Sequence, residues 1–160
     1  MTEPIVKEEQ IDKPALLRRA ALFADLPEDA VQALAKLARV AVYPEGDEII
    51  EEGAEFDEEM DGIFIVVSGA VEVRTGSTDG TDGTLLMRLG PGEFFGEMAL
   101  LDGRPRSASV FAAEEAQCLV LHRWDFLREL RRNTEIAERM LATLSGRLRA
   151  MNAALGRLAE

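Results

Sequence analysis

The spacing of hydrophobic residues divides the chain into three regions. From Ala15 to about residue 37, apolar side chains recur at helical spacings that are interrupted near Pro27. Between residues 40 and 122, short β-branched runs alternate with glycine and proline, as in strands joined by turns. Helical spacing returns after Arg123. The pattern therefore predicts short N-terminal helices, a β-rich body and C-terminal helices.

The β-rich region contains seven runs with the length of strands. They recur at roughly 8 to 12 residue spacing, which is typical of a sandwich or a barrel. The runs are VAVYPEG, DEIIEEG, GIFIVVSG, AVEVRTG, TLLMRLGPG, SASVFAA and QCLVLH. Between two of them, the polar and glycine-rich segment 75–84 predicts a long hairpin loop. Its aspartates lack the ordered spacing of a calcium-binding loop, so we expect no metal there.

A long helix with an apolar seam is predicted at the C-terminus. Seven apolar residues recur there at steps of four and three, and the last five alternate strictly: Ile136, Met140, Leu144, Leu148, Met151, Leu155 and Leu158. This alternation is typical of a coiled coil. Because two heptads are marginal alone, the seam needs support from the globular body. We expect a homodimer along this helix; packing of the helix on its own domain is the alternative.

Composition narrows the class of protein. The 160 residues carry a formal net charge of −12, which argues against unaided binding to nucleic acid or to an anionic membrane. A single cysteine, Cys118, fits a reducing compartment, and neither a signal peptide nor a membrane span is recognisable. We expect a cytoplasmic protein with a flexible arm at 1–14 and one domain at 15–160, with strands in about 38–122 and helices in about 124–158.

The segment FFGEMALLDGRPRSASV, residues 94–110, carries the candidate chemistry. A short helical turn that begins near Gly96 and Glu97 would offer backbone N–H groups to an anion. A turn through glycine and proline then returns the chain, so that Arg106 and Glu97 can face one cavity. A guanidinium suits phosphate oxygens and a carboxylate accepts from hydroxyls, which together suit a ribose phosphate. An ordinary ion pair between the two side chains is the alternative.

This segment resembles the phosphate-binding cassette of the cyclic nucleotide-binding domain family. The matching residues are Phe95-Gly96-Glu97-Met98-Ala99-Leu100 and Pro105-Arg106-Ser107-Ala108. The runs YPEGDEIIEEG and IFIVVSGAVEV also resemble the family, and the resemblance covers about residues 15–160. It implies a mainly β fold with flanking helices: an eight-stranded β-roll, jelly-roll-like and built as a double-stranded β-helix, with N-terminal helices and a long C-terminal helix.

The resemblance also implies a role for each cassette residue. Arg106 would bind the exocyclic oxygens of a cyclic phosphate, and Ser107 would add a hydroxyl and an N–H to the same group. Glu97 and the Gly96 backbone would bind the ribose 2′-OH. Two backbone amides would complete the anion site: those of Met98 and Ala99.

For the base, the resemblance is less specific. By position, Val73 and Leu89 would line the base, although both could simply belong to the core. On the C-terminal helix, Asn152 falls near the purine-contacting polar residues of dimeric, catabolite-activator-like members, and Met151 replaces one of them. The sequence therefore leaves the ligand open between cAMP and cGMP, with a slight preference for cAMP.

The resemblance predicts a receptor rather than an enzyme. No helix-turn-helix module or kinase-like tandem repeat is recognisable, so we expect a stand-alone bacterial-type sensor that signals to an unidentified protein effector through movement of its C-terminal helices. His122 and Cys118 lack catalytic neighbours, and no metal ligands cluster. We expect neither catalytic residues nor a catalytic cofactor.

Two other functions stay open on the same fold. A ligand-independent interaction module could present its acidic surface to a basic partner. A cyclic dinucleotide sensor would need a second cation for the second phosphate, and Arg88 and Arg104 are the candidates.

Overall fold

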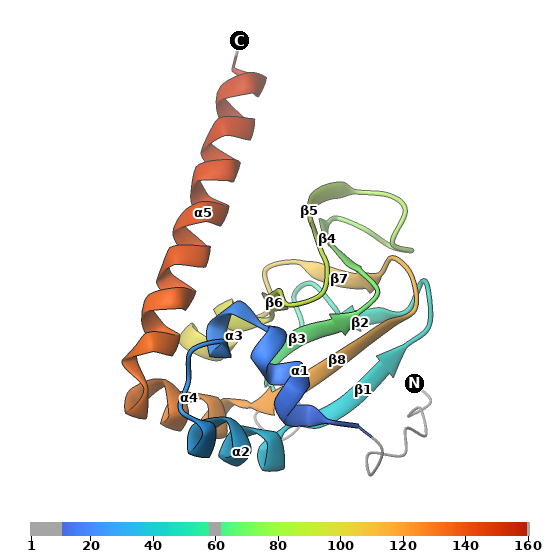
Figure 1. Cartoon of the computed structure of the whole chain (residues 1–160). Coiled ribbons are helices and arrows are strands. Elements are labelled where there is room, and N and C mark those ends of the chain that lie inside the picture. Colours follow the sequence, from blue (N-terminus) through green and yellow to red (C-terminus); the bar gives the residue numbers. More distant parts are fainter. Residues whose placement is uncertain (1–10, 58–61, 160) are drawn as a thin grey trace.

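The computed structural model describes residues 11–57 and 62–159. Within them, eight strands form two antiparallel four-stranded sheets, with helices at one side (Figure 1). The first sheet has the order β1-β8-β3-β6 (Arg39–Tyr43, Ala116–His122, Gly62–Ser68, Phe94–Phe95). The second has the order β2-β7-β4-β5 (Glu48–Ile50, Ser109–Ala112, Val71–Thr75, Thr84–Leu89). The predicted eight-stranded fold with flanking helices is confirmed.

Seven of these strands coincide with the seven runs of the sequence pattern. The eighth, β6, contains only Phe94 and Phe95 and lies inside the cassette. Two residues are too few to show a period of two, so pattern reasoning did not find this strand. Its residues pair with Ile65 and Phe64 of β3, which places the start of the cassette at the edge of the first sheet.

The N-terminal helices are α1 (Lys13–Arg19), the 3₁₀ turn η2 (Ala21–Phe23) and α2 (Glu28–Leu37). Helix α1 begins at Lys13, two residues earlier than expected. Asp12 caps it by accepting a hydrogen bond from the Ala15 N–H at 3.1 Å. Pro14 fits the first turn because its missing N–H has no helical partner there. The rest of the predicted arm, residues 1–10, lies outside the described residues.

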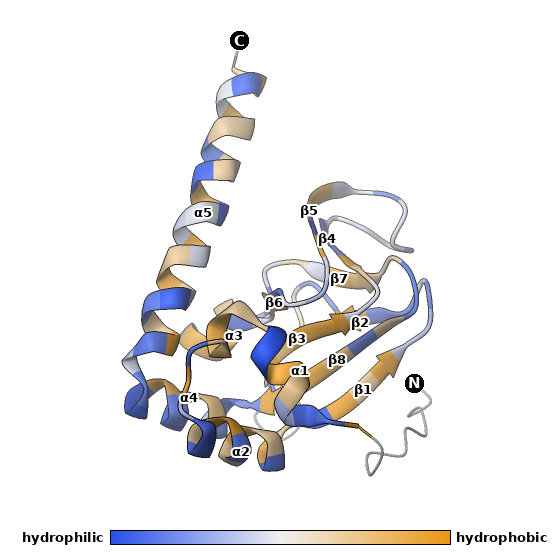
Figure 2. Ribbon diagram, viewed as in Figure 1, coloured by the Kyte–Doolittle hydropathy of each residue, from blue (hydrophilic) through white to orange (hydrophobic). Residues whose placement is uncertain are grey.

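Two apolar clusters hold the fold together. One lies between the sheets and includes Val66, Val71 and Cys118. Burial raises the pKa of the Cys118 thiol to about 12, so it behaves as a small apolar residue. The other lies between the first sheet and the helices and includes Leu119 and Phe126. Hydrophobic residues accordingly colour most of β1 and β3 (Figure 2).

The C-terminal helices are α4 (Arg123–Arg132) and α5 (Thr134–Leu158). The first half of α5 packs on the domain, where Ile136 and Met140 are buried. The second half projects past the other helices (Figure 1), and its seam residues Leu155 and Leu158 are 62% and 82% exposed. The predicted seam is therefore divided between the domain core and solvent. Among the described residues, no helix has the length and apolar character needed to cross a membrane.

Candidate ligand-binding site

A cavity of about 560 Å³ lies between β4, β5, α3 (Glu97–Asp102) and α5. This volume is within the usual range of small-molecule sites, about 300 to 1,000 Å³. Every site residue expected from the sequence lines it, with the exception of Asn152: Val73, Leu89, Gly96, Glu97, Met98, Ala99, Arg106 and Ser107. Segments far apart in the sequence thus meet at one concave surface.

Gly96 makes the sharp turn from β6 into α3. Its φ of 84° lies in the left-handed region, where a side chain is strained. A Cβ here would lie 3.2 Å from Arg106 Nη1 and 3.2 Å from the carbonyl oxygen of Gly62. Glycine is therefore needed both for the backbone conformation and for the close approach of the arginine.

Arg106 is held from several sides. Only 6% of the residue is exposed, and its Nη1 donates a hydrogen bond to the Gly96 carbonyl at 2.9 Å. Its guanidinium carbon lies 5.1 Å from the centre of the Phe56 ring. Its backbone N–H donates to the Ala54 carbonyl, and its own carbonyl accepts from the Gly53 N–H, both at 2.8 Å. These contacts fix a buried cation at the cavity wall.

Glu97 is also 6% exposed, but its ion-pair partner is Arg147 of α5. The Arg147 Nη1 lies 3.3 Å from Glu97 Oε1, and its Nη2 donates to the Phe94 carbonyl. The Arg147 guanidinium carbon also lies 4.5 Å from the Phe94 ring centre. The Glu97–Arg106 rim pair that the sequence allowed is thus replaced by a buried contact between α3 and α5.

Arg147 is the charged lining residue that sequence reasoning missed. It lies three residues after Leu144 and four before Met151, and all three line the cavity. Residues at these spacings share one helix face, so the seam itself contained the signal. Local motifs could not reveal it, because its role depends on where α5 packs.

The remainder of the lining is apolar. From β4 and β5 come Val73, Met87 and Leu89, and from α5 come Leu148 and Met151. Within the described part of the chain, four polar side chains line the cavity, and all lie around the beginning of α3: Glu97, Arg106, Ser107 and Arg147. The cavity therefore has a polar end and an apolar end.

Asn152 does not contribute to this lining within one chain. It is exposed on α5, one position beyond Met151. Consecutive helical residues point about 100° apart, which places Asn152 on a different part of the helix surface from Met151.

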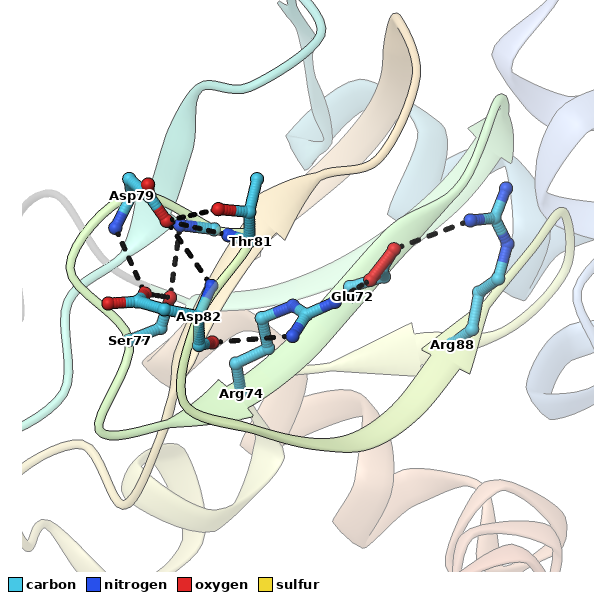
Figure 3. Close-up of polar contacts among 8 residues, drawn as sticks. Glu72, Arg74, Ser77, Asp79, Thr81, Asp82 and Arg88 are labelled. Carbon is cyan, nitrogen blue, oxygen red and sulfur yellow. Dashed lines mark hydrogen bonds and ion pairs between the residues drawn. The ribbon is translucent and has the colours of Figure 1, made fainter.

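Arg88 and Arg104, the candidate cations for a second phosphate, do not line the cavity. Arg88 is paired in register with Glu72, and its Nη1 lies 3.5 Å from Glu72 Oε1 (Figure 3). Because alternate strand residues face opposite sides of a sheet, these two point away from the cavity that Val73 and Leu89 line. Arg104 is exposed and also outside the lining. The second guanidinium at the cavity is that of Arg147.

The glycine-rich loop between β4 and β5 uses its acidic groups internally (Figure 3). Asp82 accepts hydrogen bonds from the Ser77 hydroxyl at 2.8 Å and from the Thr78 hydroxyl and N–H at 2.7 Å. The Thr78 bonds are the main cause of a lowered pKa of the Asp82 carboxyl. Across the described residues, no three His, Cys, Asp or Glu side chains are grouped as a metal site would need.

Comparison with known proteins agrees with this geometry. Residues 40–133 match the model of the cyclic nucleotide-binding domain family. The chain is 38% identical over 134 residues to the cyclic AMP receptor protein of Thermus thermophilus, covering 83% of this chain and 59% of that protein. It is 41% identical over 112 residues to human cGMP-dependent protein kinase 2, covering 69% of this chain and 14% of the kinase.

Among solved structures, the catabolite activator protein of Thermus thermophilus superposes with a TM-score of 0.71 at 35% identity. The superposition covers 88% of this chain and 63% of that one, so the chain spans less than two thirds of either Thermus protein. The matched segment includes the whole cassette and both sheets beyond Arg39. The chain therefore belongs to the cyclic nucleotide-binding domain family.

Proposed function

We propose that the cavity binds one cyclic mononucleotide, cAMP or cGMP, and that the protein is a receptor that leaves the ligand chemically unchanged. The observation that carries this proposal is that Arg106 and Glu97, each 6% exposed, line one cavity. The guanidinium would bind the exocyclic phosphate oxygens, assisted by Ser107. The carboxylate would accept the ribose 2′-OH.

The charge of the lining supports a mononucleotide. Among the described residues, the charged side chains that line the cavity are Glu97, Arg106 and Arg147, which sum to +1. A cyclic mononucleotide carries one negative charge, and a cyclic dinucleotide carries two. Because a buried charge without compensation is costly, the lining matches the smaller ligand better.

The lining also supports binding without turnover. Hydrolysis of a phosphodiester needs a general base or a metal that activates water. Among the described residues that line the cavity, Glu97 is the single carboxylate and it is paired with Arg147; the lining contains no histidine or cysteine.

The helix α5 would convert binding into a signal. A cyclic mononucleotide has about 20 non-hydrogen atoms, and about 0.3 kcal/mol for each gives about −6 kcal/mol, or a Kd of tens of micromolar. Tighter binding needs contacts from α5, which carries Arg147, Leu148 and Met151 to the cavity. A ligand that binds better with α5 in place would shift the helix toward that position and signal to a protein effector.

The exposed half of α5 supports a homodimer. Leu148 and Leu155 are 61% and 62% exposed on the predicted seam, which a second copy of the helix would cover. Light scattering should therefore give twice the chain mass of 17.6 kDa. Leu155→Glu should return the mass to that of one chain, whereas a wild-type protein of 17.6 kDa would exclude the dimer.

Calorimetric titration of the protein with cAMP, cGMP and a cyclic dinucleotide tests the proposed function. We expect one site per chain for a mononucleotide, and chromatography of the same sample should return the nucleotide intact. Absence of heat and of competition up to millimolar mononucleotide would refute the proposal.

A further inference from the structure

Phe56, in the segment that follows β2, lies close to two guanidinium groups. The ring centre is 5.1 Å from the guanidinium carbon of Arg106 and 6.0 Å from that of Arg123. Both distances are within the range of about 6 Å at which the electron-rich face of an aromatic ring attracts a cation. The ring is partly buried against the apolar cluster beneath the helices. Phe56 does not itself line the cavity.

Arg106 and Arg123 belong to different elements of the fold. Arg106 lines the cavity, and Arg123 is the first residue of α4, the helix that leads into α5. The Arg123 Nε donates a hydrogen bond to the Leu100 carbonyl of α3 at 2.8 Å. The ring of Phe56 therefore connects the cavity wall with the beginning of the C-terminal helices.

We propose that Phe56 is a positioning residue that orients the Arg106 guanidinium for the anion and couples it to Arg123. The proposal rests on the proposed function, because it assigns Arg106 to the phosphate. The Gly96 carbonyl fixes one edge of the guanidinium at 2.9 Å, and the ring adds a contact from another element. An anion bound to Arg106 would change the electric field at the Phe56 ring. It would thereby also affect Arg123, which contacts the same ring.

Substitutions that keep a large apolar side chain but remove the ring test this role. Phe56→Leu should weaken cAMP binding about tenfold, or about 1.4 kcal/mol. Phe56→Tyr keeps the ring and should bind within about twofold of wild type. If Phe56 had a merely structural role, Phe56→Leu would have a lower melting temperature, but its affinity for cAMP would not differ from that of Phe56→Tyr. Phe56→Met is a second ringless variant for the case in which Phe56→Leu does not fold.

A readout in the ligand-free protein separates this proposal from the proposed function. Ring currents should displace the Nε–H resonances of Arg106 and Arg123 in wild type and in Phe56→Tyr. In Phe56→Leu the displacement of Arg106 should vanish, and that of Arg123 should decrease to the part caused by the Trp124 ring, whose centre lies 5.3 Å from the Arg123 guanidinium carbon. If wild type does not bind nucleotide, the proposed function fails, and these resonances still decide whether the ring positions the arginines. Addition of cAMP should move the Arg123 resonance in wild type and leave it in place in Phe56→Leu.

Two results would overturn the proposal. One is Phe56→Leu and Phe56→Met binding cAMP within twofold of wild type. The other is Arg106 and Arg123 resonances that are the same in Phe56→Leu as in wild type.

Discussion

The two ends of the cavity are built in different ways. The polar end comes from one continuous segment, residues 96–107, with Arg147 added from α5, and its main charges are buried. The apolar end is assembled from β4, β5 and α5, and its α5 residues Leu148 and Met151 are 61% and 46% exposed. Under the proposed function, the polar end selects the class of ligand, whereas the apolar end accepts the base by packing and connects it to the exposed half of α5.

The largest expected effect is at the polar end. Arg106→Ala should weaken binding of cAMP about 100-fold or more, because two hydrogen bonds to a charged phosphate contribute about 1.5 to 3 kcal/mol each. Arg104→Ala removes the same charge two residues away, outside the lining, and should bind within twofold of wild type. Calorimetry on both variants measures the difference. Equal affinities would mean that the phosphate is not bound by Arg106.

The next largest effect is expected at the contact between α5 and the polar end. Arg147→Gln removes the ion pair between α5 and Glu97, which is 3.3 Å long and mostly buried, and should weaken binding about tenfold. Arg149→Gln is the control, since Arg149 is exposed on the same helix and outside the lining. If Arg149→Gln had the larger effect, net charge rather than this contact would control affinity.

Changing the base should matter less than changing the phosphate. An apolar surface discriminates poorly between polar groups, whereas a site built of hydrogen-bonding side chains discriminates by several orders of magnitude. We therefore expect cAMP and cGMP to bind within about tenfold of each other, and 5′-AMP, with its additional charge, to bind more weakly than either. Competition titrations measure all three. A hundredfold preference for one base would contradict an apolar base site.

The smallest effect belongs to the exposed side of the apolar end. Leu148→Ala should weaken binding about threefold, because it removes part of a half-covered surface. Leu141→Ala shortens the same type of side chain at a residue that is 65% exposed and outside the lining. The affinity of this variant for cAMP should equal that of wild type. The same loss in both variants would show that α5 stability, and not contact with the base, is responsible.

The sequence allowed the polar end to be predicted more fully than the apolar end. Gly96, Glu97 and Arg106 lie within one short segment, so their spacing and the resemblance were enough to bring them together. Arg147 and Leu86 also line the cavity, but neither belongs to a local motif, and their positions depend on how α5 and β5 pack. Arg88 was considered for a phosphate and faces the opposite side of its sheet, where Glu72 pairs with it.

The long helix shows a second limit of periodicity. The seam from Ile136 to Leu158 correctly predicted an apolar face, but a repeat does not state which partner covers each part. In the structure, Ile136 and Met140 are buried in the domain, and Leu158 is 82% exposed. The helix of 25 residues packs on the domain through its first half, and its second half projects past the other helices (Figure 1).

A crystal structure of the protein with cAMP tests the central claim most directly. The account predicts one nucleotide per chain, with its exocyclic phosphate oxygens within hydrogen-bond distance of Arg106, its 2′-OH at Glu97 and its base against Val73 and Leu89. A phosphate bound away from Arg106, or a nucleotide bound outside the cavity, would contradict it.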